Sequence, residues 1–358
     1  MATKLEISDL DFDGIKTNLR NFLSQQDEFR DYDFEGSGMS VLLDLLAYNT
    51  HYLGYNANMV ANEMFLDSAD LRSSVVSKAK QVGYTPTSST SADAVVDVVV
   101  NNATGASLTM SRGTKFTTTV NGISYSFVNN TELTITPSDG VYKFSSVKLN
   151  EGTLLNFKYT ANTSDTDQRF IIPNNNVDTN TLTVKVQESS SDATTNTYTL
   201  ATGITGLDST SKVYFLQEVE NGRFEVYFGD GVLGKAIADG NIVIFDYVVC
   251  NRNAPNGATT FTLSGTVGGF SSATVTTISN ATNGAGPESI ESIKYNAPRD
   301  YTSQDRAVTA DDYKVLVKSL YANAQSVQVY GGEDAATPEY GKVFISIKAK
   351  SGTTLTES

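Results

Sequence analysis

The most informative hydrophobic pattern of this sequence lies in a long helical stretch from Met39 to Met64. At about 100° per residue, its apolar positions form two stripes that lie about 120° apart on the helix. The first stripe contains Met39, Leu42, Leu46, Leu53, Ala57, Val60 and Met64, and the second contains Val41, Leu45, Tyr48, Tyr52, Tyr55 and Met59. Polar residues separate the stripes in steps of seven, as Asp44, His51, Asn58 and as Asn49, Asn56, Glu63.

A helix with two apolar faces needs two neighbours, and a segment of this size can supply one from its own fold. Tyr and Met are common at partner surfaces, because Tyr combines apolar area with a hydroxyl that tolerates water at the rim. We therefore predict a partner interface in a helical bundle at Leu42, Leu46, Tyr48, Tyr52, Leu53, Tyr55 and Met59. The alternative is that both stripes pack inside one domain, and Gly54 is a position where the helix could break.

Two shorter helices complete a predicted N-terminal helical region over residues 1–88. Ile15, Leu19, Phe22 and Leu23 share one face of a helix. Farther on, Asp67 or Ser68 is expected to cap a helix that carries Leu71, Val75, Ala79 and Val82. Gly83 is expected as its left-handed C′ residue, and Pro86 prevents its continuation.

The pattern changes to β-strands in a predicted middle domain over residues 89–285. Asn121-Gly122 separates two alternating runs, which predicts a hairpin, and Asn221-Gly222 repeats the device. Asp230-Gly231 marks a further turn, and residues 241–249 predict a strand covered on both faces. The Ser/Thr-rich stretch 189–197 is interpreted as an exposed loop. Residues 130–210 otherwise carry no pattern that we recognise.

A small α+β domain is predicted over residues 286–358. Thr309 and Asp312 resemble a capping box at the start of a helix that carries Tyr313, Leu316, Val317 and Leu320. Strands are expected at 326–330 and 342–349. The predicted fold class is thus a multidomain α+β protein with an N-terminal helical bundle arm, a β-rich middle domain and a small C-terminal α+β domain.

Composition narrows the possible partners. The 358 residues carry a formal net charge of −14, which disfavours nucleic acid and anionic membrane surfaces. The N-terminus does not resemble a signal peptide, and no run approaches the roughly 18 apolar residues of a membrane span. Cys250, the single cysteine, lies in an apolar run and is expected to be a buried thiol.

Candidate catalytic and metal-binding motifs lack residues that their chemistry requires. One histidine, His51, is too few for triads and two-histidine metal sites. Two runs that begin like calcium loops, at Asp9 and at Asp31, have Arg20 and Leu42 where the bidentate Glu is needed. Their carboxylates are better interpreted as charges at helix N-termini. We expect no enzymatic activity, no cofactor and no metal.

Several stretches together resemble a known family. Residues 34–50, 69–76 and 83–88 resemble the N-terminal region of the ring-forming baseplate wedge subunit of T-even-type contractile-tailed phages. Residues 111–116, 227–231, 284–292 and 305–313 are similar to the broader baseplate J-like family. Because relatives continue past the position of Ser358, we expect the chain to be either naturally short or truncated there.

The resemblance implies a structural role in the virion, with assembly in the bacterial cytoplasm. Such subunits contribute N-terminal helices to a bundle shared with a second copy and with another wedge protein. Their C-terminal domains join neighbouring wedges into a ring around the hub, and the ring rearranges as the sheath contracts. A β-rich tail adhesin that binds a receptor is the alternative, and a tail-associated glycan hydrolase is a weaker one because the chain has no Trp.

Overall fold

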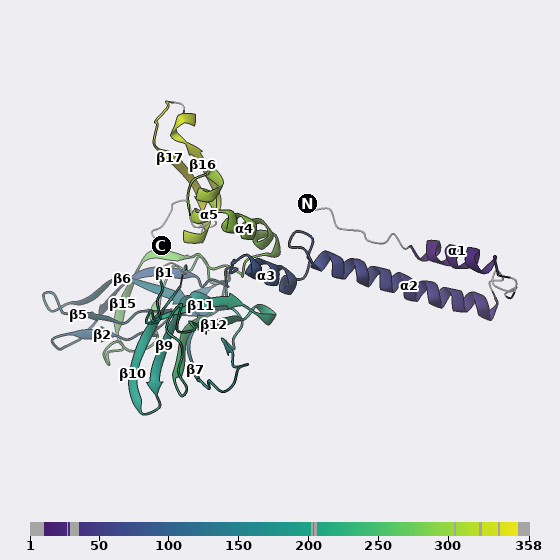
Figure 1. The fold of residues 1–358 in the computed structure, drawn as a ribbon. Coiled ribbons are helices and arrows are strands. Elements are labelled where there is room, and N and C mark those ends of the chain that lie inside the picture. The colour runs from purple at the N-terminus through teal and green to yellow at the C-terminus, as the bar shows by residue number, and fades with distance from the viewer. Residues whose placement is uncertain are drawn as a thin grey trace. The chain divides into compact units, whose positions relative to one another are not determined.

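The computed structural model describes residues 11–26, 28, 36–201, 203, 206–303, 306–321, 324–335 and 337–349. Its contacts divide the chain into two compact units, Met1–Val82 and Gly83–Ser358. The first unit is helical, as predicted (Figure 1). Its described helices are α1 (Phe12–Leu23), α2 (Gly38–Glu63) and α3 (Arg72–Gln81).

Helix α2 is covered from within the chain on a third face that the two-stripe pattern did not include. Its buried residues are Ser40, Leu43, Ala47, Gly54 and Ala61. Helix α1 packs against α2 through a face that contains the buried Ile15, and Lys16 forms an ion pair with Asp44 (Figure 1). Phe22, expected on the packed face of α1, is instead 60% exposed. Gly54, named as a position where the helix could break, lies inside the continuous helix α2.

Helices α2 and α3 both begin at local polar contacts. The Ser37 hydroxyl caps α2 by accepting a hydrogen bond from the Ser40 amide at 3.1 Å. The predicted cap of α3 by Asp67 or Ser68 is wrong. Instead the Glu63 carboxylate accepts hydrogen bonds from the amides of Asp70 and Leu71, because the turn after α2 brings the end of that helix to the start of α3.

Two mainly antiparallel sheets dominate the second unit. The chain segment that forms one sheet is inserted between two strands of the other. The first β module has the strand order β14-β3-β4-β6-β1-β15, and the inserted β module has the order β7-β13-β9-β10-β11-β12-β8, in which β10 and β11 alone are parallel. The chain leaves the first module after β6 and returns before β14. The first module comprises β1 (Asp93–Val100), β3 (Lys115–Val120), β4 (Ile123–Asn129), β6 (Tyr142–Glu151), β14 (Thr262–Leu263) and β15 (Ala273–Thr282), with the small pair β2 (Leu108–Met110) and β5 (Leu133–Ile135). The inserted module comprises β7 (Thr153–Thr160), β8 (Phe170–Ile171), β9 (Val177–Ser189), β10 (Asp192–Leu200), β11 (Val213–Glu218), β12 (Phe224–Phe228) and β13 (Ile242–Val249).

Each module has its own hydrophobic core. Phe116, Phe127 and Phe144 are buried in the first, and Phe245, Tyr247 and Val226 are buried in the inserted one. Strand β13 lies between β7 and β9 and buries side chains on both faces, as predicted.

The chain crosses between the modules at a narrow neck. Glu151, the last residue of β6, is fully buried, and its carboxylate accepts hydrogen bonds from the Asn251 amide at 2.8 Å and from the Asn251 side chain at 2.6 Å. Gly152 follows with a φ of +127°, and a Cβ there would lie 2.3 Å from the Val249 carbonyl oxygen. The outgoing and returning segments are therefore held together at the crossing.

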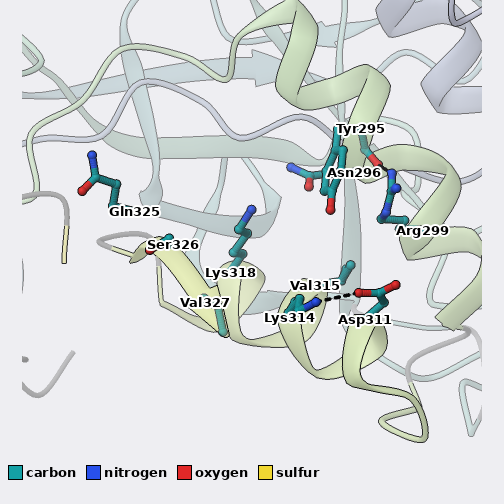
Figure 2. A pocket seen from close by; sticks show the side chains of 10 residues that line it. All are labelled: Tyr295, Asn296, Arg299, Asp311, Lys314, Val315, Lys318, Gln325, Ser326 and Val327. Carbon is teal, nitrogen blue, oxygen red and sulfur yellow. Dashed lines mark hydrogen bonds and ion pairs between the residues drawn. The ribbon is translucent and has the colours of Figure 1, made fainter. Parts of the chain in front are cut away.

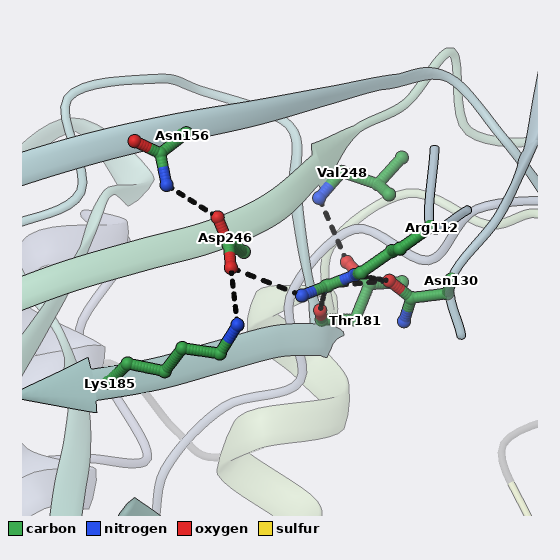
Figure 3. Close-up of polar contacts among 7 residues, drawn as sticks. All are labelled: Arg112, Asn130, Asn156, Thr181, Lys185, Asp246 and Val248. Atoms are coloured by element: carbon green, nitrogen blue, oxygen red, sulfur yellow. Dashed lines mark hydrogen bonds and ion pairs between the residues drawn. The ribbon is translucent and has the colours of Figure 1, made fainter. Parts of the chain in front are cut away.

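A polar network links the modules a second time (Figure 3). Arg112, which follows β2, donates hydrogen bonds to Asn130 of its own module and to Asp246 and the Thr181 carbonyl of the inserted module. Asp246 also contacts Lys185 at 3.4 Å and Asn156 at 2.6 Å. Desolvation lowers the pKa of Arg112, and the charge of Asp246 opposes that shift.

The predicted turns are confirmed, and one predicted loop is wrong. Asn121 and Gly122 both have positive φ in the β3–β4 hairpin, as do Asn221 and Gly222 between β11 and β12. The stretch 189–197, however, mostly belongs to strand β10, whose exposed face carries the polar residues. In this stretch β10 pairs with β9, and only Thr199 and Leu200 beyond it pair with β11, so the stretch is a strand although its side chains face water.

The C-terminal end of the second unit is a small α+β region, as predicted. It contains α4 (Ile290–Ser303), α5 (Ala310–Leu320), β16 (Ala324–Gly331) and β17 (Val343–Ala349). The capping box of α5 is confirmed, with hydrogen bonds in both directions between Thr309 and Asp312. Helix α4 was not predicted. The predicted fold class is confirmed, and the domain boundaries at 88 and 285 stay predictions.

Candidate partner interface

All seven residues of the predicted interface lie on α2 with large exposed surfaces. Leu42, Leu46, Tyr48, Tyr52, Leu53 and Tyr55 are 52–63% exposed, and Met59 is 43% exposed. The rings of Tyr48 and Tyr52, one helical turn apart, contact each other at a centroid distance of 5.7 Å. The described helices of the first unit therefore leave these side chains uncovered.

Three further residues of α2 belong to the same surface but were left out of the predicted set. Val41, Leu45 and Val60 are 62–64% exposed. All three lie in the two stripes, so the periodicity contained them. We call the ten exposed side chains together the α2 apolar surface: Val41, Leu42, Leu45, Leu46, Tyr48, Tyr52, Leu53, Tyr55, Met59 and Val60.

The described part of the chain packs against a third face of α2, which carries small residues. Ala47, Gly54 and Ala61 are spaced by seven residues and are all buried. Small side chains allow a close approach to α2 on that face, and the large side chains are left on the other two. Ala and Gly contribute little to a hydrophobic pattern, which is why the sequence did not show this face.

The energetic scale of the α2 apolar surface is considerable. Burying one large apolar side chain contributes about 1.5–3 kcal/mol, so the exposed half of each corresponds to about 1 kcal/mol. Ten such side chains represent on the order of 10 kcal/mol, which is comparable to the roughly 4–15 kcal/mol that association costs. A partner must therefore cover most of both stripes before stable binding follows.

Two buried carboxylates, those of Asp178 and Glu151, make contacts that hold the β modules together. Asp178 accepts hydrogen bonds from the Ser91 amide and hydroxyl at 2.8 and 2.6 Å, which joins the inserted module to the start of the first, and burial raises its pKa. Burial also raises the pKa of Glu151, against the effect of its hydrogen bonds with Asn251.

The remaining candidate chemistry falls into two groups. Cys250 is buried, as predicted, and burial raises the pKa of its thiol to about 11. Of the carboxylates in the calcium-like runs, Asp11 is the N-cap of α1 and Asp13 lies in its first turn, whereas positions 31–35 lie outside the described residues. Within the described ranges, His, Cys, Asp and Glu side chains form no cluster of three that could hold a metal. Among those same residues, no helix combines the length and hydropathy needed to cross a bilayer.

Three protein-family models match successive parts of the chain. The helical domain of gp6-like baseplate wedge proteins matches residues 11–84, which contain the α2 apolar surface. The third domain of the bacteriophage baseplate wedge protein gp6 matches residues 156–254, nearly the extent of the inserted β module. C-terminal domain I of the baseplate structural protein gp6 matches residues 309–358.

A curated relative aligns with almost the whole chain. The baseplate wedge protein gp6 of Enterobacteria phage T4 is 31% identical over 372 aligned residues, which cover 96% of this chain and 54% of the relative. The chain thus spans about half the length of that protein. A solved structure, the cryo-EM baseplate of the anti-feeding prophage, overlaps 87% of this chain and 57% of its own chain at 11% identity and a TM-score of 0.31. Similarity at this TM-score does not support an assignment of fold or function.

Proposed function

Because the chain belongs to the gp6-like family of phage baseplate wedge proteins, we propose that it is a structural subunit of a contractile-tail baseplate. The resemblance stated from the sequence motifs is confirmed for the wedge family, and the broader J-like likeness stays a prediction. In this proposal the work of the protein is mechanical, and no bond is made or broken. It joins wedges into a ring and transmits ring rearrangement to sheath contraction.

The α2 apolar surface is the observation that carries the proposal. Ten large side chains on two faces of one helix are left in water by the chain itself, and contiguous exposed apolar area of this kind marks interaction sites. A helix covered on one face by its own chain and open on two others has the geometry of a bundle member. We assign the two stripes to helices of a second copy and of another baseplate wedge protein.

We also propose the other partners of the protein and its location. The C-terminal α+β region faces neighbouring wedges in the ring, and the protein resides in the tail baseplate of the virion after assembly in the bacterial cytoplasm. The net charge of −14 argues against nucleic acid and membrane as partners. Titratable groups committed to structural contacts support a protein that is not an enzyme.

Substitution of Tyr52 by Asp tests the interface directly. The charge would have to be desolvated inside the bundle, which costs several kcal/mol, whereas on the exposed helix of the free chain it costs little. We expect Tyr52→Asp to reduce recovery of the chain in complex with the other wedge proteins at least tenfold on co-expression. Unchanged circular dichroism of the isolated variant would show that the β modules still fold.

Asn18→Asp is the matched control, because it adds the same charge to an exposed polar position of α1, outside both stripes of α2. We expect this variant to assemble normally. Normal assembly of Tyr52→Asp would remove the second stripe from the interface.

A further inference from the structure

A pocket of about 230 Å³ lies in the C-terminal α+β region, between α4, α5 and β16 (Figure 2). Three of its lining residues are cationic and one is anionic: Arg299 on α4, Lys314 and Lys318 on α5, and Asp311 on α5. Lys314 is paired with Asp311 at 2.9 Å, an interaction that lowers the pKa of that carboxyl. The pocket therefore carries an excess of positive charge in a chain whose net charge is −14.

The other two cations, Arg299 and Lys318, both lie near the ring of Tyr295. The Arg299 guanidinium carbon lies 3.6 Å from the centroid of the Tyr295 ring, and the Lys318 ammonium lies 5.5 Å from the same centroid. The guanidinium also donates a hydrogen bond to the Tyr295 carbonyl at 2.7 Å, which fixes its orientation. Within the described residues, neither Arg299 nor Lys318 forms an ion pair with a carboxylate. Both charges act on the pocket, so an anion that enters it is attracted by the two together.

Helix α4 is firmly placed, so this arrangement of cations is preorganised. The Glu288 carboxylate, just before α4, accepts hydrogen bonds from the Tyr84 hydroxyl at 2.9 Å and from the Ser292 hydroxyl at 2.6 Å. The Asn296 side chain donates to the same carboxylate at 2.9 Å, and Asn296 also lines the pocket. A preformed cationic site loses little entropy when it binds its ligand.

We propose that this pocket binds an acidic segment of a neighbouring protein, whose carboxylates are attracted by the excess positive charge of Arg299 and Lys318. Val315 and Val327 line the same pocket, so the walls offer apolar contact to the methylene groups of an Asp or Glu side chain. The pocket is smaller than the roughly 300–1,000 Å³ of small-molecule sites, which suits a side chain better than a cofactor. The choice of a protein as the source of the carboxylate rests on the proposed assembly function.

Calorimetric titration of the full chain with acetyl-tetraglutamate amide at low ionic strength tests the proposal. We expect binding that weakens as salt is added, since salt screens exposed charges. The double variant Arg299→Gln/Lys318→Gln is expected to bind at least tenfold more weakly. The control Lys115→Gln/Lys158→Gln, which removes two exposed cations from β3 and β7, is expected to bind within about twofold of the parent chain.

Three outcomes would overturn the proposal: no binding of the acidic peptide, equal binding by the Arg299/Lys318 double variant, or equal binding of acetyl-tetraglutamine amide. Tighter binding of inorganic phosphate than of the peptide would overturn the assignment to a protein segment. The assay contains no other baseplate component. Its failure therefore leaves the α2 interface standing, and failure of the Tyr52→Asp assembly test leaves the pocket standing.

Discussion

Glu151 shows how a single buried carboxylate can make the stability of this protein depend on pH. The residue is fully buried at the neck between the β modules, and its pKa is raised above the ordinary 4.5. In the window between that value and the raised pKa, the folded chain binds more protons than the unfolded chain. The free energy of unfolding therefore falls as the pH rises through this window.

Glu151→Gln is expected to remove this part of the pH dependence. The Gln amide can accept from the Asn251 backbone and donate to the Asn251 side chain after that amide turns over, so the contact survives without a buried charge. Urea unfolding from pH 4.5 upward should show a smaller loss of stability for the variant than for the parent chain. An identical slope for both proteins would mean that Glu151 is not responsible.

At the scale of elements, the sequence predicted what depends on local chemistry. The Asn-Gly turns were found because they require positive φ at both residues, and the capping box at Thr309 because its two hydrogen bonds connect residues three apart. Helix α4 was missed because Pro298 lies inside it, and its buried Ile293 and Ala297 form a short pattern. Strand β10 was missed because its polar stretch is a strand through its pairing with β9, which a local polar pattern does not reveal.

The exposed apolar residues of α2 could be predicted from the sequence more completely than most of the fold. The stripes of α2 could be seen because Leu, Tyr and Met are large and recur at helical spacing. The basic pocket could not be predicted, because Arg299 and Lys318 come from different helices and meet at Tyr295 only after α4 and α5 pack.

Thr309→Ala tests the contribution of the capping box to α5. The change removes the hydroxyl that accepts from the Asp312 amide, and loss of an N-cap costs about 0.5–2 kcal/mol. Hydrogen exchange of the α5 amides should accelerate correspondingly. Thr309→Ser keeps the hydroxyl and should exchange like the parent chain, so equal acceleration in both variants would contradict the assignment.

At the scale of the whole molecule, the insertion of one β module into another decides how stability is shared. Residues 153–249 fold into a sheet with its own core, and they are tied back to the first module by Glu151–Asn251, Ser91–Asp178 and the Arg112 network (Figure 3). No local pattern predicts such an insertion, because it depends on pairings such as β1 with β15 that are far apart in the sequence.

Arg112→Met is expected to weaken that coupling. It keeps most of the apolar side chain but removes the hydrogen bonds to Asp246 and Thr181, at a cost of about 1–3 kcal/mol. Scanning calorimetry should show a broader or split transition for this variant. Arg169→Met removes an ion pair with Glu225 that lies inside the inserted module, so it should lower the transition temperature without splitting it. A single sharp transition for Arg112→Met would contradict the coupling role.

Cryo-electron microscopy of intact tails that contain this chain can show whether α2 is a member of a bundle inside a baseplate. We expect density for the chain in a continuous ring, with both stripes of α2 packed against helices of other chains. Density at the tips of outward fibres, or α2 facing solvent within the ring, would contradict it.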